Sequence, residues 1–301
     1  MPNATRASLL KGPAYVTYDS GSFHAFGQID VQLVTEFFDV APSGFGTVQR
    51  RLADRRVEVR FTPAEWNNLG VMFPYASKQI GDTLFPAADK ALVITPRNGA
   101  PLTIHNAAIT GLPNLRLSAV NSILGPIAFT GLCKDGEDPA TLANFFSFGV
   151  AAANAAQTGL DLSKIANAKY KLARNSVDFY SADGFSIDWE LQTEPDRPDG
   201  DTTINYRLTG LAATLRFTPS GMTEVNYAAL LDGLAVGAPA TGYDGTISGG
   251  SAPAVSVTLD NLIVETANLA YGPAANRTGE VVMRAVRTIA TGALTALWTI
   301  G

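Results

Sequence analysis

The densest group of carboxylates lies in one short segment, which contains Glu194, Asp196, Asp199 and Asp201. Several carboxylate oxygens close together are what a calcium ion requires. The spacing is not that of an EF-hand loop, and two prolines and a glycine in the same segment favour a solvated hairpin tip. We expect a hairpin turn here, with an ion site as the alternative, and we predict no metal or cofactor for this protein.

Histidine and cysteine are the other side chains that catalysis most often uses. His24 and His105 have no nearby Cys, His or paired carboxylate, and no P-loop, G-x-S-x-G or H-E-x-x-H motif occurs. Cys133 follows an apolar run, which is typical of a buried, unreactive thiol. A Ser-His-Asp site stays open as an alternative, because its members come from distant positions. We nevertheless expect no catalytic residues and no enzyme.

Four arginines recur as two matched pairs. Two of them begin copies of Arg-Phe-Thr-Pro, and the other two each precede a leucine nine residues earlier. They are either solvent-facing strand arginines or members of ion pairs between subunits, formed with strand carboxylates. The candidate inter-subunit contacts are therefore Arg51, Arg60, Arg207, Arg216, Asp30 and Asp188.

These arginines belong to an internal repeat. Residues 50–63 and 206–219 align without a gap at an offset of 156, with six identities. The repeat continues outward at offsets of 158 (Asp30 with Asp188), 155, 154 (Gly125 with Gly279) and 152. Its last match joins residues 145–149 to 297–301, so both copies end at corresponding points. We therefore predict two tandem modules, residues 1–149 and 150–301, with an Ala-rich linker at about 149–165.

Alternating apolar and polar residues predict strands, most clearly at residues 55–61. The other expected strands are 14–18, 28–38, 91–95, 102–109 and 125–132 in the first module, and 186–193, 205–217, 255–264 and 279–289 in the second. The Gly/Ser-rich segment 237–253 is expected to be a flexible loop. Each module is thus predicted to be mainly β, a β-sandwich or partly closed barrel.

One helix per module is expected after Arg-Phe-Thr-Pro. In the first module Thr62 suits the N-cap, Pro63 the first helical position, and Glu65 a capping box, so the helix would cover residues 64–76. The same Thr-Pro signal predicts a helix over residues 220–233 in the second module.

Composition favours a protein that assembles with partners. Only 16% of residues are charged, which is sparse for a free monomer. The net charge of −5 disfavours a protein that grips nucleic acid. No run of 18 apolar residues occurs, and residues 1–12 lack a long apolar stretch, so we expect neither a membrane span nor a secretory signal.

Two segments resemble the tail tube (major tail) proteins of tailed bacteriophages. They are the strand–Phe-Thr-Pro–helix unit (55–75) and residues 124–149, where an apolar strand precedes a charged turn and a segment that ends in aromatics. The resemblance implies two packed sheets with a helix, in rings stacked around a DNA channel. Because such rings hold six modules, a two-module chain implies three chains per ring with pseudo-sixfold symmetry. Residues 297–301 depart from the pattern, since they end the second module without the charged turn.

The resemblance also implies a virion protein, assembled in the host cytoplasm. Its partners would be other copies of itself, the tape measure protein and other tail proteins, with DNA as passing cargo and no membrane. The alternatives are another virion component, such as a baseplate or decoration protein, and a carbohydrate- or receptor-binding β-sandwich pair. Sugar binding would favour clustered exposed Trp or Tyr side chains, whereas Trp66, Trp189 and Trp298 fall in different elements and are expected to pack internally.

Overall fold

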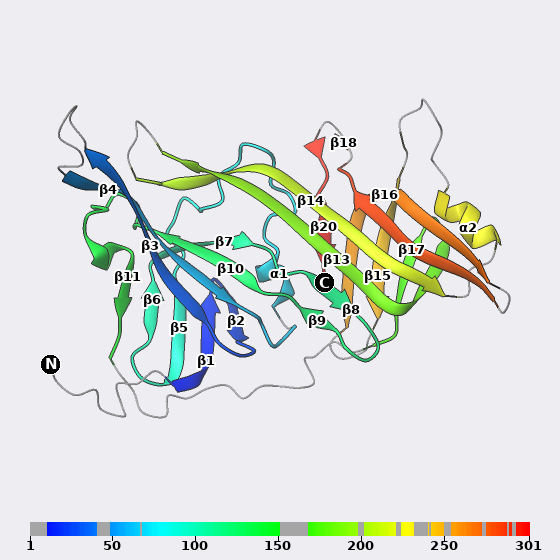
Figure 1. The fold of residues 1–301 in the computed structure, drawn as a ribbon, viewed down its shortest axis with the longest axis horizontal. Helices are drawn as coiled ribbons and strands as arrows, with labels where there is room; N and C mark the ends of the chain where they lie inside the picture. Colours follow the sequence, from blue (N-terminus) through cyan, green and yellow to red (C-terminus); the bar gives the residue numbers. More distant parts are fainter. Residues whose placement is uncertain are drawn as a thin grey trace.

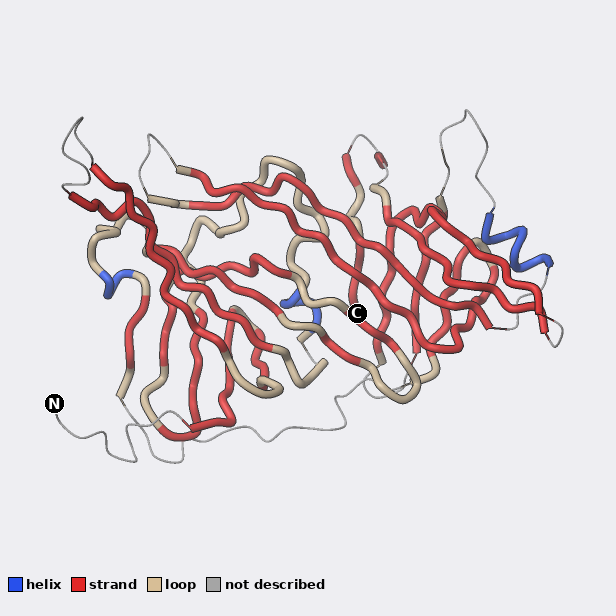
Figure 2. Tube along the Cα trace, viewed as in Figure 1, coloured by secondary structure: helices blue, strands red, loops and turns tan. Residues whose placement is uncertain are grey.

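The computed structural model describes residues 11–40, 49–66, 68–150, 168–197, 202–220, 224–231, 240, 242–249, 254–272, 275–287, 289–290 and 293–301. Of the described residues, 63% lie in strands and 5% in helices, which confirms the prediction that the protein is mainly β. The molecule is elongated, with the first half of the chain at one end and the second half at the other (Figure 1). Figure 2 shows how little of the chain is helical.

The first half forms two antiparallel sheets. The strands of one sheet are, in order, β11 (Phe146–Phe148), β6 (Leu102–Ile104), β5 (Leu92–Asn98), β1 (Lys11–Tyr18) and β2 (Gly21–His24). Those of the other are β3 (Asp30–Val40), β4 (Gln49–Phe61), β10 (Ile127–Leu132) and β7 (Asn106–Gly111). Apolar residues of both sheets meet between them, where the ring of Phe129 lies 4.9 Å from that of Tyr18 and 6.0 Å from that of Phe61.

The second half forms a closed barrel. Its six strands are, in order, β12 (Tyr170–Arg174), β15 (Tyr243–Gly249), β16 (Val255–Gly272), β17 (Ala275–Ala285), β14 (Asn205–Ser220) and β13 (Val177–Asp196). Because β12 also pairs with β13, the ring of strands closes. Strand β20 (Trp298–Ile300) pairs with β16, and β18 (Ile289–Ala290) pairs with β19 (Ala293–Leu294).

The two halves pair their strands by the same scheme. The first half pairs β1–β2, β1–β5, β5–β6 and β6–β11, and the second pairs β12–β13, β12–β15, β15–β16 and β16–β20. Likewise β3–β4, β4–β10 and β10–β7 have the counterparts β13–β14, β14–β17 and β17–β16. The long strands β13 and β16 each occupy the places of two shorter strands, β2 with β3 and β6 with β7.

Both helices differ from the prediction. Helix α1 covers only Leu69–Met72, after Asn68. The expected capping box does not form, because Pro63 bridges to Ala25 and the Glu65 carboxylate binds His24 instead. In the second half the Thr-Pro pair stays within β14, and α2 covers Glu224–Leu231. The expected ends of that helix, residues 221–223 and 232–233, lie outside the described residues.

The segment 237–253 is not simply a loop, because Tyr243–Gly249 forms β15 between β12 and β16. Glycine is required here for close packing. A Cβ atom on Gly245 would lie 2.2 Å from Leu262 Cδ1. The absence of a side chain at Gly245 therefore leaves room for the buried Leu262 side chain to pack against β15. Gly245, which contributed to the prediction of a loop, therefore belongs to a strand.

Candidate assembly interface

A strand of the first half pairs with the barrel of the second half. Strand β8 (Leu115–Leu117), which forms a hairpin with β9 (Ile123–Leu124), lies antiparallel to β13. Leu115 faces Ile187 and Leu117 faces Phe185, and all four side chains are fully buried. A segment from earlier in the chain thereby covers this edge of β13. Arg116 Nη2, for example, donates to the carbonyl oxygen of Asp183, which follows it by 67 residues.

A glycine makes this close approach achievable. Gly184 has a φ angle of +92°, and a Cβ atom there would lie 2.3 Å from the carbonyl oxygen of Leu117. Both the left-handed backbone and the contact with the backbone of β8 exclude a side chain at this position. Gly184 therefore helps to determine where β8 docks.

Three aromatic residues continue the contact between the halves. The ring of Trp189 lies 5.0 Å from Phe73 and 4.6 Å from Trp298. The indole nitrogen of Trp298 donates to the Phe73 carbonyl at 3.4 Å, and the Leu297 amide donates to the Ala76 carbonyl at 2.9 Å. All three tryptophans are buried, as expected from the sequence.

Residues 81–84 of the first half also bind along the start of β14. The amide of Gly81 donates to the Leu208 carbonyl, the amide of Leu208 to the Asp82 carbonyl, and the amide of Leu84 to the Tyr206 carbonyl, all at 2.8–2.9 Å. This ladder satisfies backbone groups on a strand edge that would otherwise need water or another strand.

A buried carboxylate fastens the tip of the β13–β14 hairpin to the first half. Asp54 is fully buried, and its Oδ1 accepts the backbone amides of Arg55 (2.9 Å) and Thr203 (3.1 Å). Its Oδ2 accepts the Thr203 hydroxyl at 2.8 Å and Arg197 Nη2 at 2.9 Å. Arg197 also binds Glu36 on β3 at 2.9 Å. Four donors thus compensate for burial of this charge.

The edge of β3 contrasts with the covered edge of β13. Among the described residues β3 pairs only with β4, so its other edge carries no strand. Val31 and Leu33 are 44% and 43% exposed, although their partners on β4 belong to the core. At the same places of the second half, Ile187 and Trp189 are 0% and 8% exposed. Exposed apolar side chains on an unpaired edge are typical of an interaction surface.

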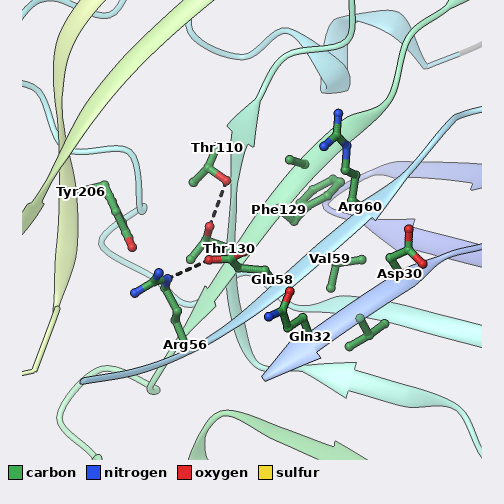
Figure 3. A pocket seen from close by; sticks show the side chains of 12 residues that line it. Asp30, Gln32, Arg56, Glu58, Val59, Arg60, Thr110, Phe129, Thr130 and Tyr206 are labelled. Carbon is green, nitrogen blue, oxygen red and sulfur yellow. Dashed lines mark hydrogen bonds and ion pairs between the residues drawn. The ribbon is translucent and has the colours of Figure 1, made fainter. Parts of the chain in front are cut away.

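The outward face of the same sheet is a polar groove of about 740 Å³ (Figure 3). Arg56 binds Glu58 at 2.8 Å and Glu36 at 2.7 Å, and Tyr206 of the second half approaches Arg56. Thr110 and Thr130 share a hydrogen bond of 2.9 Å. Arg60 lies opposite Asp30 in the strand register but forms no ion pair with the described residues. Its charge is therefore available to a partner at the rim of the groove.

The other predicted contact residues have partners within the chain. Arg216 lies 3.3 Å from Asp188, and Arg207 lies 3.0 Å from Asp196. Arg51 donates to Gln49 at 3.3 Å. These are exposed surface contacts, which contribute little stability. Whether any of them also contacts a second subunit stays a prediction.

The strand register corrects one alignment made from the sequence. Asp30 lies opposite Arg60, whereas Ser186 lies opposite Arg216. Aligned on their arginines, Asp30 therefore corresponds to Ser186 and not to Asp188, which lies opposite Thr214. The predicted offset of 158 residues between β3 and β13 is therefore wrong, and the strand register gives an offset of 156 residues.

The histidines, the cysteine and the acidic segment do not converge. Buried His24 contacts Glu65 at 2.9 Å, and Cys133 donates to the Glu137 carbonyl at 3.5 Å. Burial, reinforced by nearby carboxylates, raises the pKa of the Cys133 thiol, which opposes thiolate formation. Burial and Lys134 lower the pKa of His105. Glu194 and Asp196 belong to β13, whereas Asp199 and Asp201 lie outside the described residues.

Within the described part of the chain, no group of three or more His, Cys, Asp or Glu side chains is arranged to hold a metal ion. No helix there is long and apolar enough to cross a membrane. Comparison with protein-family models and with curated proteins found no match. The inference of function therefore rests on the geometry of the interface.

Proposed function

We propose that this protein is a structural virion subunit that forms the tail tube of a bacteriophage, as stacked rings around a channel for DNA. One observation carries the proposal: both halves share one strand-pairing scheme, and the first half already covers an edge of the second as neighbouring modules of a ring would. A chain in which two similar modules associate edge to edge is suited to repeat that contact between chains.

The strand registers support descent of both halves from one module. Residue pairs that face each other in the first half recur in the second at offsets between 152 and 156 residues, the range that contains the sequence identities other than those first aligned at 158. The corresponding pairs are Val16–Phe23 with Leu172–Phe179, Ile94–Leu102 with Ile247–Val257, Val59–Phe129 with Leu215–Met283, and Leu102–Phe148 with Val257–Ile300. The proposed modules are those predicted above, residues 1–149 and 150–301.

The number of chains in a ring follows from the duplication. If each chain supplies two modules, a six-module ring needs three chains and has pseudo-sixfold symmetry. The partners in this proposal are other copies of the chain, the tape measure protein and further tail proteins. DNA would pass through without specific contacts, in keeping with the net charge of −5.

Carbohydrate binding receives less support. Sugar sites commonly use exposed aromatic rings, whereas all three tryptophans are buried and two of them pack at the contact between the halves. No observation favours a baseplate or decoration protein over a tube protein.

Negative-stain electron microscopy of the purified full-length chain tests the proposal. We expect hollow tubes or stacked rings, with threefold symmetry in end-on averages. A protein that remains monomeric at high concentration and forms neither rings nor tubes would contradict it. Solid fibres without a channel would contradict it as well.

A further inference from the structure

The hairpin that docks on β13 has a counterpart in the second half. In the first half, β8 and β9 form a hairpin between β7 and β10, and at its base the Gly125 amide donates to the Asn114 carbonyl at 2.7 Å. In the second half the outer ends of β16 and β17 form a hairpin in the same place, with Leu269 opposite Thr278. At its base Gly279 lies against Asn268, since a Cβ atom on Gly279 would lie 2.7 Å from Asn268 Cβ.

The two hairpins share their place in the repeat. Asn268 and Gly279 each follow Asn114 and Gly125 by 154 residues. In both halves the hairpin points in the same direction along the molecule, and the second one reaches its outer end, at the right of Figure 1. The first hairpin ends on the barrel of the second half, whereas the second extends beyond that barrel.

The edge that the first hairpin covers also has a counterpart. Residues 185–187 of β13 correspond in register to residues 29–31, at the start of β3. There the edge is open and Val31 and Leu33 are exposed. Gly27 has a φ angle of +87° and open space around its Cβ position, whereas Gly184 has a φ angle of +92° and abuts β8. The start of β3 thus resembles the covered edge of β13 without its strand.

A chain cannot close this contact on itself. The open edge belongs to the first half and the unpaired hairpin lies at the far end of the second, with the barrel between them (Figure 1). Only a hairpin from another molecule can reach β3. A contact between different surfaces of identical chains is head-to-tail, and it closes into a ring when the rotation per step divides a full turn.

We propose that the outer part of β16, Leu269–Gly272 of one chain, pairs antiparallel with residues 29–31, at the start of β3, in a second copy. Val31 and Leu33 become buried in that contact, as Ile187 and Trp189 are buried in the contact within the chain. This inference deepens the proposed function and rests on it, because it identifies the two surfaces that join chains within a ring. Every contact between neighbouring modules then has the same geometry, whether or not it crosses between chains.

Lysine substitutions on the open edge test the inference. In Val31→Lys and in Leu33→Lys a charge would have to enter the contact, so we expect the dissociation constant between chains to rise by about 100-fold or more. Both positions are exposed in the single chain, so folding should be preserved. Ile80→Lys is the matched control, since Ile80 is likewise an exposed apolar side chain (75% exposed) and lies in a turn rather than on a strand edge. Sedimentation velocity over a concentration series gives the mass of each species, and circular dichroism verifies the fold.

A cross-link identifies the donor strand. Cysteines replace Val31 and Leu269, the counterparts of the facing pair Ile187 and Leu115, in a chain with Cys133→Ser, and mild oxidation should link neighbouring chains into a ladder of two and three under denaturing conditions. Each single-cysteine chain is the control and should give little linked product. A chain in which Ile80 and Leu269, instead of Val31 and Leu269, are replaced by cysteine should also remain unlinked.

The outcomes separate the two proposals. If the wild-type protein forms rings, but the lysine variants assemble with unchanged affinity and the cysteine pair does not link, the edge contact is wrong while the tube proposal stands. If the wild-type protein is monomeric and the cysteine pair does not link, both are wrong. Specific linking together with solid fibres would support the edge contact and overturn the tube.

Discussion

At the residue scale, loss of the buried Asp54 carboxylate should destabilise the contact between the two halves. The fully buried carboxylate accepts hydrogen bonds from Thr203 and Arg197 of the second half. Asp54→Ala leaves these donors without their acceptor, so we expect the free energy of unfolding to fall by about 2–4 kcal/mol. Urea denaturation measures the change. Asp39→Ala is the control, because the exposed Asp39–Arg50 pair should contribute at most about 0.5 kcal/mol. An equal decrease in the free energy of unfolding in both variants would contradict the role assigned to Asp54.

Two buried tyrosines should make the protein sensitive to alkali. Burial and the neighbouring Asp19 raise the pKa of Tyr18 from 10.0 to about 12, and burial raises that of Tyr75 further. The folded protein keeps these protons at a pH where the unfolded chain releases them. Stability is therefore unaffected below about pH 9 and falls as the pH rises from 10 towards 12.

Removing one hydroxyl should weaken this dependence. Tyr18→Phe loses the hydrogen bond to the Ala107 carbonyl, about 1 kcal/mol at neutral pH, but its stability should fall less steeply between pH 10 and 12. Urea titrations at several pH values measure both effects, with the exposed Tyr180→Phe as control. An unchanged slope in Tyr18→Phe would refute the role of this hydroxyl.

Residue patterns in the sequence predicted burial of the tryptophans but not the role of Asp54. Aromatic residues in separate elements indicate packing whatever their partners are. Asp54 gives no such signal, because Thr203 and Arg197 lie 149 and 143 residues away. Only the folded chain brings these three side chains together.

At the scale of elements, the docking of β8 on β13 should depend on Gly184. A Cβ atom at Gly184 would collide with the Leu117 carbonyl, and its φ angle of +92° strains any other residue. Gly184→Ala should therefore weaken the β8–β13 pairing and destabilise the protein by about 2–3 kcal/mol. Hydrogen exchange should show faster exchange in Leu115–Leu117 and residues 185–187, with β5 unaffected.

Gly27→Ala separates the effect of backbone conformation from that of the collision. Gly27 has a similar φ angle, +87°, but open space around it. This variant should lose only about 1 kcal/mol, through strain alone. Equal losses in the two variants would show that contact with β8 contributes nothing at Gly184.

Elements with strong local patterns could be predicted, whereas those that depend on distant contacts could not. Residues 55–61 alternate clearly and form part of β4. The Thr62-Pro63 signal failed because Pro63 and Glu65 are held by contacts with Ala25 and His24 in the neighbouring strand segment. The three residues of β8 are too few for a periodic pattern, and their partner strand follows about 70 residues later.

At the scale of the whole molecule, the internal repeat was readable because insertions between the halves are short. The strand registers keep the offset within 152–156 residues, so identities in one strand align those in the next. What the repeat could not indicate is which surface of each half meets the other. That contact breaks the symmetry of the chain, since β13 has its strand edge covered while that of β3 stays open among the described residues.

This asymmetry predicts how stability depends on protein concentration. If chains associate through the open edge, assembly binds the folded state alone and raises the melting temperature by mass action. Between about 1 and 100 µM, the melting temperature of the wild-type protein should rise by a few degrees, because a contribution of about 1 kcal/mol shifts it by about 2 °C in a chain of 301 residues.

The Leu33→Lys variant should melt at one temperature over the same concentrations, since its exposed edge no longer accepts a second chain. The Ile80→Lys control should follow the wild-type protein. Differential scanning calorimetry, run at two scan rates to verify reversibility, distinguishes the cases. A wild-type melting temperature independent of concentration, at concentrations where sedimentation finds only single chains, would mean that the open edge of β3 is stable in water without a partner.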